Sequence, residues 1–440
     1  ATSEAKAESG LRIHLAGSER LDRDFILRGR IRAEELRSSV VLVPDEPGFQ
    51  AQAGEGNATL LVTLIPPTTE RVRLQPRDVA FVLDRSGSMG GWKIQAARRA
   101  LSRMVDTLGP DDRFGVIAFD DVLETFGFEA EGLTPATDRN RYQATVFLAQ
   151  IDARGGTEMA APLKKAFDLL VQTPADRAPI IFLVTDGQVG NESQLVQLLK
   201  PKGTPASQPR VQILGIDEAL NEGLLKRLAD RSNGWFLPVE SEDRLDEVFR
   251  LAALKFGAPI ATGLDLYLQG HPELNKHLVS SGSRDLFSRT PILLLSRIQL
   301  PLHAKTLTLT GQLPSGDLFR SEPTLSDGQT TSARRVWARW RIRDLEDDLA
   351  QGRTPKETAE QMTRLSLVHQ VLCRRTAFLA VDENQVVNPG GDFETLLQPV
   401  ELPRGWAAGA AVACAAPMAG GIGLTRGVVH SYAALSPSMD

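Results

Sequence analysis

The sequence predicts an α/β fold: a doubly wound, mainly parallel sheet that is inserted in a β-sandwich and followed by a helical segment. Between positions 76 and 258, continuous apolar strands alternate with helical patterns, which is typical of βαβ units around a sheet covered on both faces. On either side, residues 1–75 and 260–325 carry short alternating or apolar runs bounded by turn residues, which indicates β-strands. Because neither flank offers enough strands to cover both of its own faces, we expect the two flanks to pair into one sandwich.

The inserted segment has the clearest pattern. Val79–Leu83 and Ile180–Val184 are uniformly apolar, as expected of strands buried on both faces. Between them, apolar residues from Ile94 to Leu108 recur at helical spacing. The further strands are expected at 114–119, 211–216 and 235–237, and the further helices at about 137–152, 160–171, 192–200, 219–230 and 243–256.

The flanks and the C-terminal part are less regular. Residues 331–382 are predicted to form two helices, at 333–350 and 356–373, and a short strand at 376–381. Turn residues accumulate after this segment, and residues 383–440 are predicted to be a flexible, low-complexity tail. The strands of the flanks are expected at 11–15, 25–27, 40–43, 59–65, 264–268, 292–300 and 306–310.

The composition excludes several classes of protein. The chain has 440 residues, of which 42% are hydrophobic and 24% are charged, and these values exclude global disorder. A net charge of −5 provides no basic field, so we expect no nucleic-acid partner. The two cysteines, Cys373 and Cys414, are too few for a disulfide framework or a four-cysteine zinc site.

The two ends of the sequence were compared with the patterns of signal peptides and membrane anchors. Ala1–Glu4 has neither the basic start nor the apolar run of a signal peptide and lacks an initiator methionine, so we interpret the chain as a processed or shortened product. The longest uncharged stretch, 406–424, consists mostly of alanine and glycine and contains Pro417. We interpret it as flexible and expect no firm membrane span, with a weak C-terminal anchor as the alternative.

Oxygen-bearing side chains follow three elements of the inserted segment. Asp84, Ser86 and Ser88 follow one buried strand, Thr157 lies in the loop before a helix, and Asp186 follows another buried strand. In an open parallel sheet, ligands bind outside the carboxyl ends of the strands, where the strand order reverses, so these side chains can converge. Oxygen-only ligation favours a hard cation, and the sequence therefore predicts a site for Mg²⁺, with Mn²⁺ or Ca²⁺ as alternatives.

The spacing and charge of this set indicate its use. Positions 84, 86 and 88 alternate, so an extended turn would point the three side chains one way, with Gly87 allowing the bend. Two carboxylates and three hydroxyls leave a divalent ion unsaturated, and a carboxylate from a protein partner can take its open position. Because the five residues include no evident general base, the set indicates adhesion or another protein interaction, not catalysis.

Each of these residues also has a plainer interpretation. Asp84 and Thr157 could each cap a helix, and Asp186 with Gly187 could form a turn. Ser86–Gly90 approximates a nucleophile elbow, with Ser88 as the nucleophile of a serine hydrolase. A hydrolase would need a histidine after a later strand. The candidate histidines fall in the β-rich flank, at His271, His277 and His303.

Other residues outside this set are interpreted as structural. Glu158 is taken to begin a helix favourably, with a role beside the metal as the alternative. The arginines between 334 and 343 are taken as a solvated helix face whose charge is offset by nearby acids. The remaining ones are expected in the core: His369 as a hydrogen-bonded histidine, Trp337 and Trp340 as packing residues, and Cys373 as a buried thiol.

Three motifs together resemble a known domain. Phe81–Met89, Gly155–Thr157 and Leu183–Gly187 are similar to the metal-ion-dependent adhesion site (MIDAS) of von Willebrand factor type A domains, and the likeness extends over about 78–256. The resemblance implies that Ser86 and Ser88 bind the metal directly and that Asp84, Thr157 and Asp186 bind it directly or through water. It also implies that the last helix of the domain, about 242–256, couples to the metal loops.

The wider chain resembles inter-alpha-trypsin inhibitor heavy chains and their bacterial relatives. In that family a further β-rich domain usually precedes the point where this sequence begins. The heavy chains' Asp-Pro-His-Phe processing site is not in this sequence, so their covalent glycosaminoglycan chemistry is not carried over. The likeness is carried by Asp22–Phe25, Pro66–Pro67, Trp337–Arg339, Leu365–Leu367 and Arg375–Phe378.

Two classes of function remain open. The first is an extracellular or cell-envelope adhesion protein. The second is an intracellular scaffold subunit of a metal-insertion or motor complex, in which case the location is cytoplasmic. The β-rich flanks favour the first, because motor-associated type A domains usually accompany nucleotide-binding modules and this sequence has no Gly-x-x-x-x-Gly-Lys-Ser/Thr loop.

Overall fold

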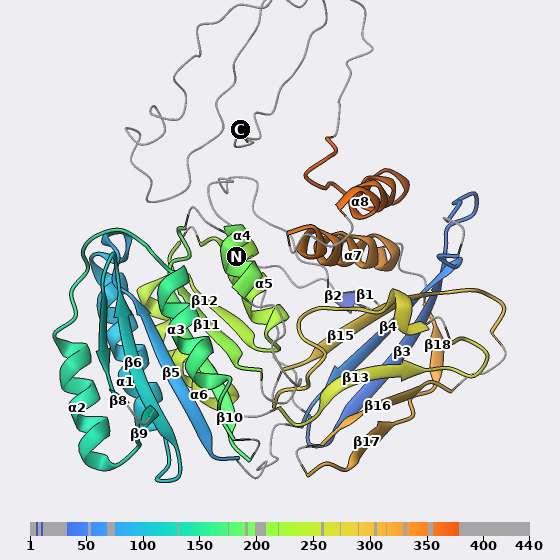
Figure 1. Ribbon diagram of the computed structural model, residues 1–440. Coiled ribbons are helices and arrows are strands. Elements are labelled where there is room, and N and C mark those ends of the chain that lie inside the picture. Colours follow the sequence, from blue (N-terminus) through green and yellow to red (C-terminus); the bar gives the residue numbers. More distant parts are fainter. Residues whose placement is uncertain are drawn as a thin grey trace, which may run out of the picture. The chain divides into compact units, whose positions relative to one another are not determined.

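The computed structural model describes most of residues 33–377, together with 6–7 and 10–11 (Figure 1). The chain divides into two units, residues 1–28 with 377–440, and residues 29–376. The described part of the first unit includes a two-stranded antiparallel pairing of β1 (Lys6–Ala7) with β2 (Gly10–Leu11). All the other helices and strands of the described residues lie in the second unit. Within 33–377, the positions not described are 52–53, 68–74, 130–131, 175, 190–191, 199–207, 219, 257–258, 273, 289, 303–305, 314, 329–331 and 351–354.

An eight-stranded sheet carries the candidate site. Its strands run in the order β12-β11-β10-β5-β6-β9-β8, with β7 also paired to β6. The five strands from β12 to β6 are parallel, and β7, β8 and β9 form an antiparallel edge. The chain goes from β5 to β6 on one side and returns to β10 on the other, so the strand order reverses at β5 and β10. The bounds are β5 (Arg77–Asp84), β6 (Arg113–Phe119), β7 (Leu123–Phe126), β8 (Phe128–Glu129), β9 (Gly132–Pro135), β10 (Ala178–Thr185), β11 (Arg210–Ile216) and β12 (Trp235–Val239).

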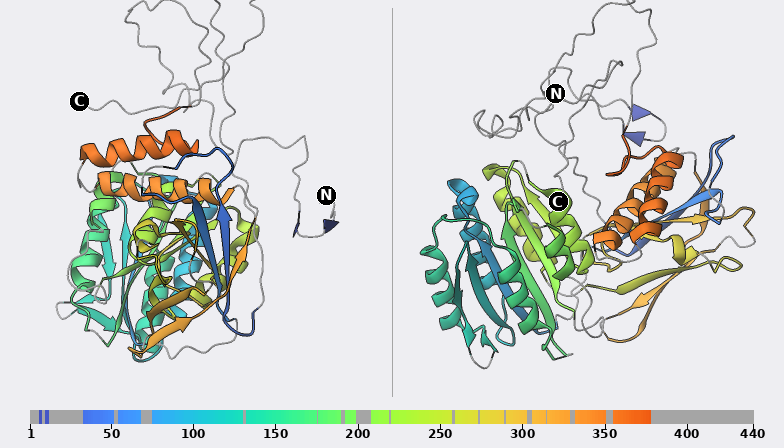
Figure 2. Two further views of the ribbon diagram at one scale, coloured as in Figure 1. Left: turned by 90° about the vertical axis from the view of Figure 1, so that its right-hand side faces the viewer. Right: turned by 45° about the horizontal axis from the view of Figure 1, so that its top comes forward.

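Helices cover both faces of this sheet (Figure 2). Along β5, Phe81 packs into a hydrophobic cluster with α1, α2 and α6, whereas Val82 packs into a second cluster with α3, α4 and α5. All eight residues of β5 and of β10 are buried, which explains the uniformly apolar runs Val79–Leu83 and Ile180–Val184 within them. The helices are η1 (Gly87–Met89), α1 (Trp92–Asp106), α2 (Asp138–Ala149), α3 (Ala160–Leu170), α4 (Glu192–Leu198), α5 (Glu222–Arg231), η3 (Glu242–Arg244) and α6 (Leu245–Lys255).

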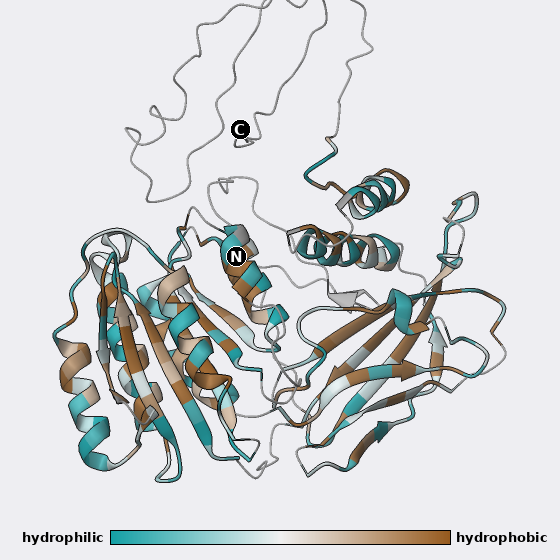
Figure 3. Cartoon of the chain, viewed as in Figure 1, coloured by the Kyte–Doolittle hydropathy of each residue, from teal (hydrophilic) through white to brown (hydrophobic). Residues whose placement is uncertain are grey.

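The predicted doubly wound α/β fold is confirmed, and the antiparallel edge is what the sequence analysis missed. Strands β7, β8 and β9 lie between positions 123 and 135, where no element was predicted. These strands have two to four residues each, and β7 has no fully buried position. Such short, half-buried strands leave too weak a pattern to be recognised. Apolar residues are concentrated on the longer strands of the sheet (Figure 3).

The flanking segments form two further sheets. The five-stranded sheet has the order β14-β15-β4-β3-β18 and the three-stranded sheet the order β13-β16-β17. Strand β4 pairs with β15 antiparallel, with Val62 opposite Leu294, and β3 pairs with β18. The two sheets share one hydrophobic cluster. The bounds are β3 (Arg37–Pro44), β4 (Ala58–Ile65), β13 (Thr262–Tyr267), η4 (Leu274–His277), β14 (Val279–Ser280), β15 (Ile292–Ile298), β16 (Thr308–Gln312), β17 (Leu318–Ser321) and β18 (Leu325–Asp327).

This pairing joins segments on either side of the inserted domain. It supports the proposal that residues 1–75 and 260–325 make one split sandwich around 76–258, although the boundaries themselves stay a prediction. Strand β18 reaches Asp327, slightly beyond the expected end of the sandwich. Of the earlier predicted strands, 25–27 and most of 11–15 lie outside the described residues.

Helix α7 (Ser332–Ala350) packs against the five-stranded sheet, and helix α8 (Pro355–His369) packs against α7. In α7, Trp337 is 1% exposed, and its indole nitrogen donates a 2.7 Å hydrogen bond to the carbonyl of His277. The same cluster contains Leu295 from β15 and Met362 from α8. Trp337, Trp340 and Cys373 are thus packing residues, as predicted. Helix α8 ends four residues earlier than expected, because Gln370 adopts a positive φ of 56°.

The described part of 376–381 has no strand, and the rest of that segment and the 383–440 tail lie outside the described residues.

His369 is fully buried, as predicted, with Nε2 2.5 Å from a carboxylate oxygen of Glu55. The prediction of a solvated basic face is wrong for Arg334, which is 7% exposed. Its guanidinium lies 3.6 Å from the ring centroid of Phe49 and 3.3 Å from Nδ1 of His369. Ion pairs with Asp45 at 4.0 Å and Glu46 at 3.9 Å counter the cost of its burial.

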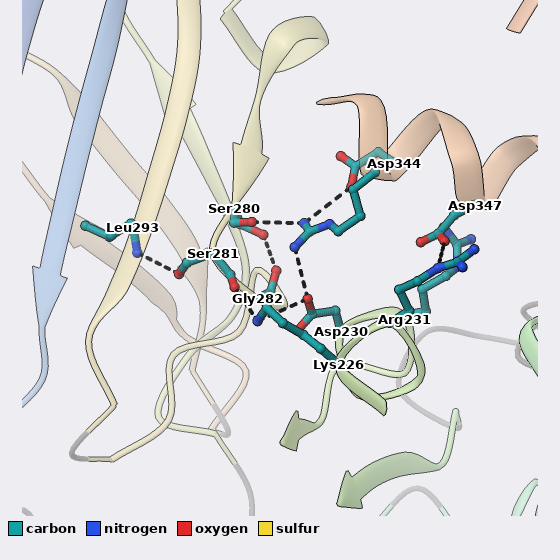
Figure 4. A network of polar contacts seen from close by, with 11 residues as sticks. Lys226, Asp230, Arg231, Ser280, Ser281, Gly282, Leu293, Asp344 and Asp347 are labelled. Carbon is teal, nitrogen blue, oxygen red and sulfur yellow. Dashed lines mark hydrogen bonds and ion pairs between the residues drawn. The ribbon is translucent and has the colours of Figure 1, made fainter. Parts of the chain in front are cut away.

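A network of ion pairs and hydrogen bonds links α5 to α7 and to the loop after β14 (Figure 4). Arg343 donates to Asp230 at 3.2 Å, and Arg227 donates to Asp347 at 2.5 Å. Lys226 donates to the carbonyl of Ser281 at 2.8 Å. Burial raises the pKa of Asp230, although Lys226 and Arg343 act in the opposite direction. Helix α5 is therefore held by charged contacts as well as by its apolar face.

None of the helices in the described part of the chain combines the length and the apolarity needed to cross a bilayer. The uncharged stretch at 406–424 lies outside the described residues, so its interpretation stays a prediction.

Candidate functional site

Two buried carboxylates lie side by side where the strand order reverses. Strands β5 and β10 are neighbours with Leu83 opposite Val184, so their carboxyl ends place Asp84 beside Thr185 and Asp186. The Thr185 hydroxyl donates a 2.6 Å hydrogen bond to Oδ2 of Asp84. Asp84 and Asp186 are both 0% exposed. This edge is the place where open parallel sheets bind ligands.

The loop after β5 brings two serine hydroxyls to Asp84. The backbone N–H of Ser86 donates to Oδ1 of Asp84 at 2.9 Å, and the hydroxyls of Ser86 and Ser88 lie 3.0 Å apart. The expected extended turn is wrong, because Gly87–Met89 forms one turn of 3₁₀ helix. Ser86 itself is extended, with φ −54° and ψ 162°, and the turn that follows brings Ser88 back towards it.

The loop before α3 lies against this first loop. The N–H of Gly87 donates to the carbonyl of Gly155 at 3.1 Å, and the N–H of Arg154 donates to the carbonyl of Arg85 at 2.7 Å. Gly155 has a φ of +70°, a left-handed conformation that favours glycine. Thr157 follows two residues later and is half-buried. The structure therefore brings the backbones of the first two predicted loops together.

A buried acid behind these loops was not found by sequence reasoning. Asp120 follows β6 and accepts hydrogen bonds from Arg85 and from Arg154, the latter at 2.8 Å. Burial opposes its ionisation, but the Val122 N–H and the two guanidinium groups outweigh burial and hold the pKa of Asp120 below its usual value. Asp120 thus joins residues of both loops, and it is already neutralised by cations of the protein.

The electrostatics of Asp84 are different. Burial raises its pKa to about 6, against the opposing effect of the hydrogen bonds from Thr185 and Ser86, and the nearby Asp186 adds to the rise. Its hydrogen-bond donors are neutral groups. Asp186 accepts from the Gln188 N–H at 3.2 Å and from the Lys93 ammonium at 3.4 Å. The pair of carboxylates therefore carries more negative charge than its surroundings compensate.

The match with a known domain agrees with this geometry. Residues 79–188 match the von Willebrand factor type A domain, and these residues include most of β5, the two loops and all of β10. The α/β domain that contains this segment is called the type A domain here, after this similarity. The match includes all five predicted site residues.

Longer matches extend beyond the type A domain. Inter-alpha-trypsin inhibitor heavy chain H4 of Bos taurus is 25% identical over 323 residues, which are 66% of this chain and 34% of that protein. The uncharacterized protein sll0103 of Synechocystis sp. is 25% identical over 248 residues, 56% of this chain and 57% of that protein. The chain thus spans about a third to just over half of the length of these relatives. The predicted resemblance to inter-alpha-trypsin inhibitor heavy chains is confirmed.

Among solved structures, a von Willebrand factor type A protein from Catenulispora acidiphila is similar, with a TM-score of 0.48 and 15% sequence identity. The similarity covers 77% of this chain and 91% of that chain.

The donor set of the type A domain fits a hard divalent cation. Its predicted members offer only carboxylate and hydroxyl oxygens, which suit Mg²⁺, Mn²⁺ or Ca²⁺. The carboxylate oxygens of Asp84 accept hydrogen bonds from Ser86 and Thr185, and those of Asp186 accept from Gln188 and Lys93. Since each carboxylate has about four lone-pair sites, acceptor positions remain for a cation or a water molecule. No cluster of three or more His, Cys, Asp or Glu side chains suited to a metal occurs in the described residues, so the hydroxyls would have to contribute.

Sequence reasoning also missed two charged residues beside the site. Lys93, in the first turn of α1, contacts Asp186, and Asp217, directly after β11, contacts Lys93 at 3.1 Å. No local motif links these positions. The one available signal was that Asp217 follows a buried strand in the same way as Asp84 and Asp186.

Proposed function

We propose that this protein is a metal-dependent interaction protein whose type A domain binds an acidic residue of a protein partner through a divalent cation, Mg²⁺ or alternatively Mn²⁺ or Ca²⁺. The observation that carries the proposal is Asp84: a fully buried carboxylate beside Asp186 whose hydrogen-bond donors are neutral. A buried charge is costly unless it is paired or ligates a metal, and a cation at this point would remove that cost.

The residues proposed to hold the cation are Asp84, Ser86, Ser88, Thr157 and Asp186. When bound, the cation supplies positive charge and a coordination position that exchanges water for a carboxylate. The chain's own residues position these ligands. The Ser86 N–H and the Thr185 hydroxyl fix the orientation of Asp84, and the 3₁₀ turn at 87–89 sets the position of the Ser88 hydroxyl.

Interaction is favoured over catalysis by the surroundings of Ser88. The Ser88 hydroxyl is hydrogen-bonded to Ser86, another hydroxyl, and no histidine is its partner among the described residues. His271 and His277 lie between β13 and β14, and His369 pairs with Glu55. His303 lies outside the described residues. The arrangement that activates a serine nucleophile is therefore missing from the described part of the chain.

The compartment and the kind of assembly are part of the same proposal. We favour an extracellular or cell-envelope location, in line with the resemblance to inter-alpha-trypsin inhibitor heavy chains. The alternative is a cytoplasmic scaffold of a metal-insertion or motor complex. The two sheets that flank the type A domain favour the first, because motor-associated type A domains usually accompany nucleotide-binding modules instead.

Metal binding is tested by calorimetry with MgCl₂ and MnCl₂. We expect one site per chain, and we expect Asp84→Ala to weaken Mn²⁺ binding by about 100-fold or more because it removes a buried ligand. The matched control is Asp138→Ala, which removes an acid of the same domain whose side chain is 96% exposed, and its affinity should equal that of the parent. If Asp84→Ala binds Mn²⁺ as well as the parent does, the site is wrongly assigned.

The open coordination position is tested by water-proton relaxation of the Mn²⁺-loaded protein. We expect fast-exchanging metal-bound water, and we expect a glutamate-containing peptide to displace it whereas the matched glutamine peptide does not. Equal effects of the two peptides would contradict recognition of a carboxylate.

The hydrolase alternative has its own test. A fluorophosphonate probe should not label Ser88, because no base is positioned to activate its hydroxyl. Labelling that is lost in Ser88→Ala would favour an enzyme.

A further inference from the structure

Lys93 is an unexpected neighbour for a cation site. It is the second residue of α1, and its ammonium lies 3.4 Å from Oδ2 of Asp186 and 3.1 Å from Oδ2 of Asp217. Its side chain is 14% exposed, and the side chain of Asp186 is 0% exposed. The protein thus places a permanent positive charge against one of the two carboxylates that would hold the metal.

The position of Lys93 is unfavourable for the helix itself. The N-terminal turn of a helix carries a partial positive charge and is stabilised by acids, but the first turn of α1 contains none. The two carboxylate partners explain a lysine at this position, whereas the partial charge of the helix terminus does not.

Asp217 is held in place to receive this ammonium. The N–H of Glu218 donates to Oδ1 of Asp217 at 2.7 Å, and the side-chain amide of Gln188 lies 3.3 Å from Oδ2. The N–H of the same Gln188 donates to Asp186. Asp186 and Asp217, which follow the neighbouring strands β10 and β11, therefore offer two adjacent positions to one ammonium group.

We propose that Lys93 is a built-in competitor for the divalent cation, and that Asp217 is the carboxylate that holds Lys93 when the cation is bound. This inference rests on the proposed metal site. Without metal, the ammonium neutralises part of the charge on Asp186. With metal, two cations would share one buried carboxylate, and their repulsion is strong where water is excluded. Contact with Asp217 allows Lys93 to stay paired while Asp186 serves the metal.

A purely structural ion pair makes a different prediction. If Lys93 only fastened α1 to the ends of β10 and β11, its removal would destabilise the protein equally with and without metal, and the affinity for metal would fall or stay unchanged. A competitor that is removed raises the affinity instead.

The test measures Mn²⁺ affinity by calorimetry for the parent, Lys93→Met, Lys93→Arg, Asp217→Asn and the double variant Lys93→Met/Asp217→Asn. We expect Lys93→Met to bind about tenfold more tightly and Lys93→Arg, which keeps the charge, to stay near the parent. We expect Asp217→Asn to bind several-fold more weakly, and this loss to shrink when Lys93 is absent. Matched controls are Lys164→Met and Asp168→Asn, which make the same charge changes in an exposed ion pair of α3 and should have little effect.

Thermal unfolding gives a second readout. In EDTA, Lys93→Met should melt below the parent because Asp186 loses its partner, and saturating Mn²⁺ should remove this deficit or reverse it. The inference is wrong if Lys93→Met binds Mn²⁺ no more tightly than the parent, or if Asp217→Asn has the same effect with and without Lys93. Should neither the parent nor Lys93→Met bind metal, the proposed function falls together with the inference, whereas equal tight binding by both overturns the inference alone.

Discussion

Buried carboxylates at the two ends of strand β5 have opposite surroundings. At the amino ends of the strands, Asp112 accepts from the Arg77 guanidinium at 2.6 and 3.0 Å and from its backbone N–H at 2.7 Å. Asp78 accepts there from Arg113 at 2.9 Å and from Arg177 at 2.7 Å. At the carboxyl ends, Asp84 accepts only from neutral donors among the described residues.

The pKa values of two acids of one strand follow this difference. Burial acts to raise the pKa of Asp78, but the hydrogen bonds and charges of Arg113 and Arg177 outweigh it, so the pKa lies below its usual value. Burial raises the pKa of Asp84 to about 6, because the described groups that oppose it, Thr185 and Ser86, are neutral. The comparison teaches that burial alone does not distinguish structure from function. What distinguishes them is whether the protein itself supplies the opposite charge.

Helix α6 connects the two ends. It begins after β12, whose carboxyl end lies at the same edge as the metal loops, and it runs back to Phe256. The carbonyl of Phe256 accepts a 3.2 Å hydrogen bond from Arg77, and its ring lies 4.8 Å from that guanidinium. Burial lowers the pKa of Lys255, the last residue of α6, to about 8.

The largest expected effect is at the amino end. Asp112→Ala leaves the guanidinium of Arg77, which is 4% exposed, without its acid, and we expect a loss of about 3–5 kcal/mol in the free energy of unfolding. Urea denaturation measures it. The control Asp138→Ala, in an exposed ion pair, should cost less than about 0.5 kcal/mol. Similar losses in both variants would show that the buried pair is not special.

A smaller effect is expected for Asp78→Asn, with a defined pH dependence. At neutral pH we expect a loss of about 1–3 kcal/mol, because two charge-assisted hydrogen bonds weaken. Since the folded state lowers the pKa of Asp78, its contribution is fully present above the unfolded value of 3.8 and is lost as the pH falls through the lower folded value. The difference between variant and parent in urea should therefore shrink below about pH 4. A difference that is constant from pH 7 to pH 3 would contradict the ion-pair explanation.

Pinning α6 would test whether the two ends communicate. We expect a disulfide engineered between α6 and α1 to change the affinity of the metal-loaded protein for a glutamate-containing peptide by about fivefold between its oxidised and reduced forms. The reason is that α6 runs from the edge of the metal loops to the Arg77 end, so a shift of this helix would move both ends. Equal affinities would make α6 a structural strut. The parent, treated with the same oxidant, is the control.

The smallest effect is expected for Asp84→Asn in EDTA. Because the metal-free protein does not neutralise this carboxylate, its replacement by an amide should change the free energy of unfolding by no more than about 1 kcal/mol, and in the stabilising direction. The same change at the other end, in Asp78, should be destabilising. A large loss of stability for Asp84→Asn would remove the contrast between the two ends.

Much of this contrast could not be predicted from the sequence. The run Val79–Leu83 predicts a buried strand because each of its residues is apolar, and the acid after it predicts a site. The arginines that neutralise Asp78 come from positions 113 and 177, and the lysine that contacts Asp186 comes from position 93. Charged residues occur throughout the chain, so spacing alone does not show which of them meet.

The sequence by itself determined the doubly wound fold and the five candidate ligands. Uniform apolarity and helical periodicity are local properties, and the carboxyl ends of parallel strands necessarily meet at one edge. Only the tertiary structure decided the short antiparallel edge, the burial of Arg334 against His369, and the pairing of Lys93 with Asp186 and Asp217. These features depend on contacts between distant segments, where a charged side chain is stabilised by the particular partner that folding brings to it.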